Sequence, residues 1–191
     1  MLVRGSLLAF AVTLAAVAVL GGTHTANAQA VFTLSSPDFK DGGRLATKNA
    51  GNNKSNPNCV GENISPALSW TGVPEGTKSL VLTMVDPEGR PPAGVNHWVA
   101  YGIKPTVTGF AEGEVSKLND KYVGGTSTQK VGFYSGPCTP AGAPHHYTFT
   151  LIATDLDPSA LKPGLTREEL VKELDGHAKV ATGLIGTFSK P

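Results

Sequence analysis

The sequence has few charged residues, two cysteines and only one long apolar run, and each shortage excludes a class of protein. Asp, Glu, Lys and Arg make up 16% of the 191 residues, and the formal net charge at pH 7 is +1. This balance provides no broad basic face, so we expect no nucleic-acid partner. The H-x-x-x-H and C-x-x-C spacings of metal sites are absent, as is the G-x-S-x-G turn of serine hydrolases.

The apolar run lies at the N-terminus and predicts a cleaved signal peptide over residues 1–28. A positive charge at Arg4 precedes it, and Ala26-Asn27-Ala28 matches the small-x-small cleavage pattern. The alternative, a membrane anchor, needs about 20 apolar residues, and this run stops at Gly21-Gly22. We therefore expect a periplasmic or secreted protein cut after Ala28, with no transmembrane segment in the mature chain. Residues 29–191 are long enough for a single domain with its own core.

Glycine (23 residues) and proline (14 residues) are frequent, which favours a β-rich fold with many turns. The run over residues 79–85 is apolar enough to be buried on both faces. In contrast, the polar stretch over residues 41–63 predicts a loop. The predicted strands are 31–34, 67–70, 79–85, 95–103, 147–155 and 184–188.

One helix is predicted before the last strand. Thr166 and Glu169 have the spacing of a capping box, which marks a helix N-terminus. We expect the helix to run from Arg167 to about Ala181, with Gly176 as a weak point in its middle.

Two turn-rich stretches, residues 86–98 and 136–147, contain three of the five histidines. Strand alternation divides these side chains between two faces. In the first stretch, Val95, His97, Val99 and Tyr101 are expected on one face, and Asn96, Trp98 and Ala100 on the other. In the second, His145 and Tyr147 point the same way. His146 points to the opposite face and is not expected to belong to the site.

If Asp86, His97, His145 and Tyr147 converge, three kinds of site are compatible with them. One is an anion site, in which loop N–H groups near Gly136 assist and Asp86 orients a histidine. The others are a metal site and a His–Asp pair for general acid–base catalysis. Each residue taken alone is equally explained as a hydrogen-bonded structural side chain.

The two cysteines, Cys59 and Cys138, allow a single pairing. In an exported chain this favours a disulfide, and the turn position of Cys138 favours it further. The alternative is two separate buried thiols. Cys138 could act as a nucleophile only if it is not bridged.

Three ordered motifs resemble those of the phosphatidylethanolamine-binding protein family, specifically its bacterial, Raf-kinase-inhibitor-like branch. Residues 59–70 are similar to the family's C-x-G-x-N-x-S-P-x-L-x-W segment. Asp86-Pro87 followed by His97-Trp98-Val99 resembles its D-P-D-A-P and H-W-V block. Gly136-Pro137-Cys138 followed by His145-His146-Tyr147 resembles its G-P-C-P-P and H-R-Y block.

The resemblance implies a β-sandwich of antiparallel sheets with a peripheral C-terminal helix. It also implies a small pocket, open to solvent, that binds phosphate-like anions, including phospholipid head groups. The pocket residues that it implies are Asp86, His97, Gly136, Pro137, His145 and Tyr147. The sequence departs from the family pattern at Glu88 and Arg90, which alter the pocket rim; Arg90 either adds a cation or points into water.

Three functional hypotheses follow. The first is a non-enzymatic exported protein that binds a small anion and needs no cofactor. The second is a regulator or inhibitor of a partner protein. The third, the alternative, is a hydrolase or metalloenzyme built on Asp86, His97 and His145.

Overall fold

The computed structural model describes residues 30–191, and the predicted signal peptide, residues 1–28, lies outside them. Every predicted strand has a counterpart, although the ends differ by a few residues. Within residues 30–191, no helix is long and apolar enough to cross a membrane. The elements in chain order are β1 (Thr33–Ser35), β2 (Gly43–Arg44), the 3-10 turn η1 (Thr47–Asn49), β3 (Leu68–Thr71), β4 (Ser79–Asp86), β5 (Val95–Ile103), β6 (Gly109–Phe110), β7 (Val123–Gly124), β8 (His145–Thr154), α1 (Arg167–Glu173) and β9 (Ala178–Phe188).

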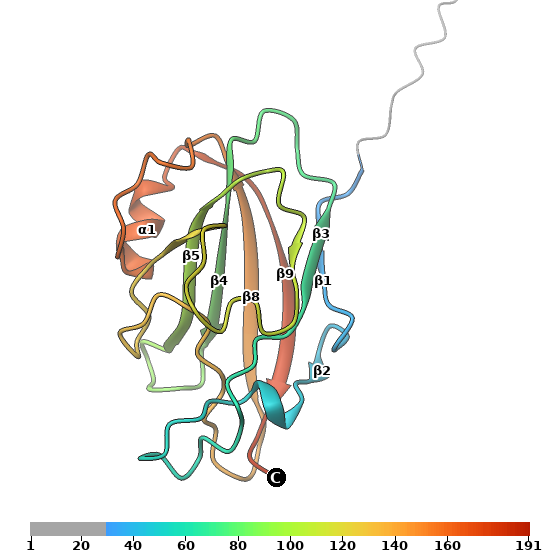
Figure 1. The fold of residues 1–191 in the computed structure, drawn as a ribbon, viewed down its shortest axis with the longest axis vertical. Helices are drawn as coiled ribbons and strands as arrows, with labels where there is room; N and C mark the ends of the chain where they lie inside the picture. Colours follow the sequence, from blue (N-terminus) through green and yellow to red (C-terminus); the bar gives the residue numbers. More distant parts are fainter. Residues whose placement is uncertain (1–29) are drawn as a thin grey trace, which may run out of the picture.

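The strands form two sheets, one large and one small (Figure 1). The large sheet has the order β2-β9-β8-β4-β5-β7, and its neighbours are antiparallel except for the short parallel pair β2–β9. The small sheet has the order β1-β3-β6 and is antiparallel throughout. The mainly β sandwich with one peripheral helix, as predicted, is confirmed.

The main core lies between the two sheets and is rich in aromatic side chains. Trp70 of the small sheet and Trp98 of the large sheet both contact Phe110, with ring centroids 5.4 and 5.8 Å apart. Helix α1 contributes to a second apolar cluster, in which Leu170 packs with Val81 of β4. Strand β4 is therefore buried on both faces, as its uninterrupted apolar run predicts.

The predicted helix is correct at its start and wrong at its end. Thr166 Oγ1 accepts from the N–H of Glu169, and the Glu169 carboxylate accepts from the N–H of Thr166, which completes the capping box. The helix ends at Glu173, not near Ala181, because Gly176 adopts a left-handed conformation with φ of 77°. The following residues pair with β8 as the first part of β9.

The predicted alternation along β5 is also wrong in part, because the strand carries a bulge. Met84 and Val85 of β4 are successive, yet they pair with Trp98 and Asn96, so one extra residue, His97, lies between the partners. The bulge reverses the alternation at this point. His97 therefore lies on the side of the main core, where it packs against Tyr147, whereas Val99 packs in the helix-side cluster.

Candidate functional site

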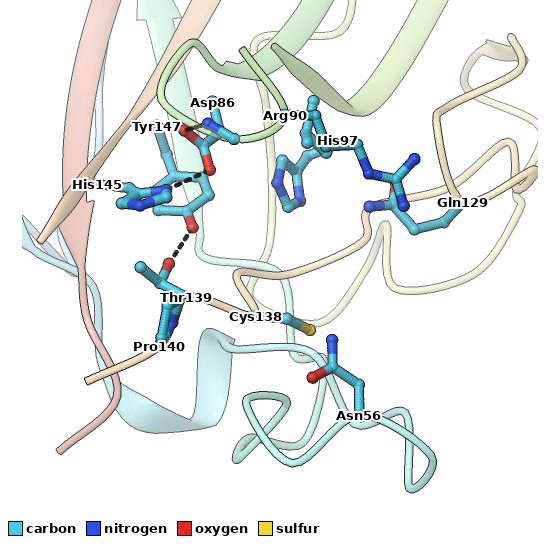
Figure 2. A pocket seen from close by; sticks show the side chains of 12 residues that line it. Asn56, Asp86, Arg90, His97, Gln129, Cys138, Thr139, Pro140, His145 and Tyr147 are labelled. Atoms are coloured by element: carbon cyan, nitrogen blue, oxygen red, sulfur yellow. Dashed lines mark hydrogen bonds and ion pairs between the residues drawn. The ribbon is translucent and has the colours of Figure 1, made fainter. Parts of the chain in front are cut away.

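A cavity of about 240 Å³ lies where the end of β4 meets the starts of β5 and β8 (Figure 2). Sheet register explains its position, because Asp86 pairs with Val95 and the preceding Val85 pairs with Thr148. The register thus brings both turn-rich stretches to one edge of the sheet. Four of the predicted site residues line the cavity together: Asp86, His97, His145 and Tyr147.

The other two predicted site residues lie behind the cavity wall. Gly136 and Pro137 are buried and are not among the lining residues. The N–H of Gly136 donates to Asn63 Oδ1 at 2.8 Å, and the carbonyl of Pro137 accepts from the N–H of Gly51 at 2.8 Å. These two backbone groups therefore join the loop over residues 51–63 to the wall of the site.

Asp86 is almost completely buried, with 4% of its surface exposed, and both carboxylate oxygens are occupied. Oδ1 accepts from the N–H groups of Glu88 and Gly89, each at 2.9 Å, which fixes the turn after β4. Oδ2 lies 2.8 Å from Nδ1 of His145. Because an ionised carboxylate can only accept, His145 carries its hydrogen on Nδ1 and presents Nε2 as its second ring nitrogen.

His97 is held in the same way by a different acceptor. Its Nδ1 lies 2.7 Å from the carbonyl oxygen of Ser135, so Nδ1 donates. The ring is 4% exposed and packs edge-on against Tyr147, with centroids 5.1 Å apart. Burial lowers the pKa of His97 below its usual 6.5, although the carbonyls of Ser135 and Gly136 and the charge of Asp86 act in the opposite direction.

Tyr147 contributes a neutral hydroxyl. Burial raises the pKa of Tyr147 well above its usual value, so the group stays protonated at neutral pH. Its oxygen is hydrogen-bonded to Thr139 Oγ1 (Figure 2). Thr139 is buried and lines the cavity, and sequence reasoning missed it. Its place in the second turn-rich stretch is the only signal that could have pointed to it.

The rim of the cavity contains the two positions that depart from the family pattern. Arg90 is exposed and also lines the cavity, so neither of its two predicted roles excludes the other. Glu88 turns away from the cavity and accepts from His146 Nδ1 at 2.7 Å. Burial alone would raise the pKa of Glu88, but hydrogen bonds from His146 outweigh it and the pKa is lowered. His146 is outside the cavity, as the alternation predicts, but it holds the rim loop.

Cys59 and Cys138 form the expected disulfide, with Cα atoms 4.4 Å apart. The bridge joins the predicted loop over residues 41–63 to the cavity wall, where Cys138 is a lining residue. The hypothetical Cβ of an alanine at Gly51 would lie 2.6 Å from Cys138 Sγ, so this position requires glycine. The bridged sulfur cannot act as a nucleophile. Residues 30–191 contain no group of three or more His, Cys, Asp or Glu side chains that could hold a metal ion.

Comparison with known proteins gives concordant matches over most of the chain. The profile of a family described as phosphatidylethanolamine-binding protein matches residues 35–189. A UPF0098 protein from Methanothermobacter thermautotrophicus is 38% identical over 156 residues, which cover 80% of this chain and 95% of that protein. The UPF0098 protein YbcL of Escherichia coli is 37% identical over 131 residues, which cover 65% of this chain and 69% of that protein.

Two solved structures have the same architecture. A putative phosphatidylethanolamine-binding protein homolog from Chlamydia trachomatis aligns with a TM-score of 0.71 at 33% identity, covering 84% of this chain and 98% of the other. The crystal structure of E. coli YbcL, described as a member of the mammalian family, aligns with a TM-score of 0.75 at 27% identity. It covers 84% of this chain and 99% of the other.

Proposed function

The chain belongs to the phosphatidylethanolamine-binding protein family, and on this premise we propose that its cavity binds a phosphate-like anion, including a phospholipid head group. The observation that carries the proposal is the matched orientation of two imidazoles. His97 and His145 both direct Nδ1 to a protein acceptor, at 2.7 and 2.8 Å, and both line the same cavity. Each Nε2 becomes a donor to an anion when its ring is protonated.

The charges around the cavity support this role. Of its lining residues, Asp86 and Arg90 carry fixed charges of opposite sign, so they leave the site close to neutral. The charge that attracts an anion must therefore come from the imidazoles, and each bound proton adds one positive charge. Tyr147 adds a neutral hydroxyl beside them.

The test is calorimetric titration with sulfate at pH 6, 7 and 8, because sulfate stays a dianion over this range. If one imidazolium is required, the affinity should fall about tenfold per pH unit above the imidazole pKa. His145→Gln should abolish this dependence. His177→Gln is the matched control, because its imidazole is exposed and does not line the cavity, and it should bind as the unmodified protein does. Equal sulfate affinity at all three pH values, or no binding, contradicts the proposal.

We also propose that the protein works outside the cytoplasm, as a non-enzymatic binding protein that regulates a partner protein. The predicted signal peptide and the disulfide both fit an oxidising compartment. Fractionation of cells that express the full chain tests the location. Recovery of the uncut chain in the cytoplasm contradicts it. A pull-down from periplasmic extract, with His97→Ala as the comparison, tests the partner.

An acid–base enzyme is the second candidate, favoured by one observation. The 2.8 Å contact between Asp86 and His145 has the geometry of a carboxylate that orients a general base. Turnover on phosphoester or ester substrates that is lost in Asp86→Asn would favour this candidate over binding alone.

A further inference from the structure

A second cavity, of about 370 Å³, adjoins the first and has different chemistry. The two cavities share four lining residues: Asn56, Arg90, Gln129 and Cys138. In Figure 2 Arg90 and Gln129 lie together at one edge of the first cavity, and Asn56 lies beyond Cys138. The first cavity alone is smaller than the roughly 300–1,000 Å³ usual for small-molecule sites, and the pair together falls within that range.

The second cavity is lined mainly by carboxamide groups, whereas the first is lined by titratable groups. Its lining includes five Asn or Gln side chains and one aromatic ring, Phe133, and Arg90 is its one charged residue. Among residues 30–191, no carboxylate lines it. Carboxamides both donate and accept hydrogen bonds, so this wall suits a neutral group that does the same.

Several of these polar groups have unused hydrogen-bonding capacity. Asn63 is engaged at both polar atoms, because its amide nitrogen donates to the Tyr134 carbonyl and its oxygen accepts from the N–H of Gly136. Asn56 uses only its oxygen, which accepts from the N–H of Asn58 at 3.0 Å. Within residues 30–191, the amide nitrogen of Asn56 and the hydroxyl of the half-buried Ser135 form no hydrogen bond.

We propose that the second cavity is a subsite for a compact, hydroxyl-rich group esterified to the anion, as in a polyol or sugar phosphate. This inference rests on the proposed anion site: the phosphate occupies the first cavity between His97 and His145, and Arg90 lies at the junction. The hydroxyl groups replace water at Asn56 and Ser135. The ring of Phe133, which lines the second cavity, provides an apolar contact for the C–H groups of the polyol.

The same lining disfavours two other substituents. An acyl chain would bury amide and hydroxyl groups without partners, which is costly. An ammonium group, as in phosphoethanolamine, would meet Arg90 and no carboxylate in the second cavity. The carboxylate of the first cavity, Asp86, is already occupied by three N–H donors.

The experiment compares three probes by calorimetry at pH 6: myo-inositol 1-phosphate, phosphoethanolamine and inorganic phosphate. We expect inositol phosphate to bind about tenfold more tightly than inorganic phosphate, as one or two neutral hydrogen bonds would give. Phosphoethanolamine should bind no more tightly than inorganic phosphate. Phe133→Ala removes a ring that lines only the second cavity. It should weaken inositol phosphate about fivefold and leave inorganic phosphate unchanged.

Ser135→Ala is an independent second variant, which should also weaken inositol phosphate because it removes a hydroxyl from the second cavity. Ser55→Ala is the matched control, because Ser55 is exposed and lines neither cavity. Inorganic phosphate binding without any gain for inositol phosphate overturns the subsite and leaves the anion site standing. Absence of inorganic phosphate binding overturns the anion site itself. A phosphoserine peptide that binds more tightly than inositol phosphate, and loses this gain in Ser135→Ala, overturns the assignment to polyols.

Discussion

The disulfide between Cys59 and Cys138 makes a quantitative prediction about stability. The two cysteines are 79 residues apart, and the loop between them contains β3 to β7. The chain-entropy relation gives about 4.5 kcal/mol for a loop of this length at 25 °C. The stabilisation arises in the unfolded chain, because the folded chain already joins the same segments by the Gly51 to Pro137 and Gly136 to Asn63 hydrogen bonds.

The measurement is urea unfolding of the unmodified protein and of the double variant Cys59→Ser/Cys138→Ser. The free energy of unfolding should fall by about 4.5 kcal/mol, and the melting temperature by roughly 10–15 °C for a domain of this size. The urea slope should increase, since the uncrosslinked unfolded chain exposes more surface. The unmodified protein treated with a reductant is the control and should match the double variant.

Sulfate binding distinguishes an effect of the disulfide on the unfolded chain from a direct effect of the disulfide on the cavity. Because backbone hydrogen bonds hold the loop in the folded state, sulfate affinity at 25 °C should be unchanged in the double variant. A loss of stability below about 1 kcal/mol refutes the loop-closure reasoning. A full loss of sulfate binding in a folded double variant shows that the bridge shapes the cavity directly.

Two further predictions concern the ionisable groups of the cavity. In Asp86→Asn the side-chain oxygen keeps accepting from the N–H groups of Glu88 and Gly89, so the amide nitrogen faces His145. Nδ1 of His145 must then accept, and its hydrogen moves to Nε2. Sulfate binding at pH 8 should rise, and imidazole ¹⁵N shifts should report the new tautomer; an unchanged tautomer refutes this. Burial lowers the pKa of His97 below 6.5. As the pH falls, His97 is therefore protonated in the unfolded chain before it is protonated in the folded chain. The free energy of unfolding should therefore fall below about pH 6.5, and His97→Gln should flatten this slope; equal slopes in both proteins contradict the reasoning.

Local sequence patterns predicted most of the fold and part of the site. The long strands β4 and β8 follow from apolar runs, and the start of α1 follows from the Thr166 capping box. Alternation alone separated His145 and Tyr147 from His146, because β8 is regular where these residues lie. In each case the determining contacts are close along the chain.

The failures share one cause, which is dependence on a distant partner. The bulge at His97 exists only in the pairing of β5 with β4. The end of α1 depends on the left-handed Gly176, which is local, and also on the pairing of the residues after it with β8, which competes with helix. Likewise, the carbonyl of Ser135 that orients His97 comes from a loop 38 residues away. No periodicity within one segment reports such contacts.

The bulge at His97 also explains how a buried imidazole reaches the cavity. In a regular strand His97 would share its face with Val99, which packs in the cluster beneath α1. The extra residue turns His97 towards Tyr147 and the Ser135 carbonyl instead. Both imidazoles are then held by acceptors behind them, and the fixed charges of Asp86 and Arg90 oppose each other. Under the proposed function, the affinity for an anion therefore depends on protonation of the two imidazoles. The site binds its ligand at low pH and releases it as the pH rises.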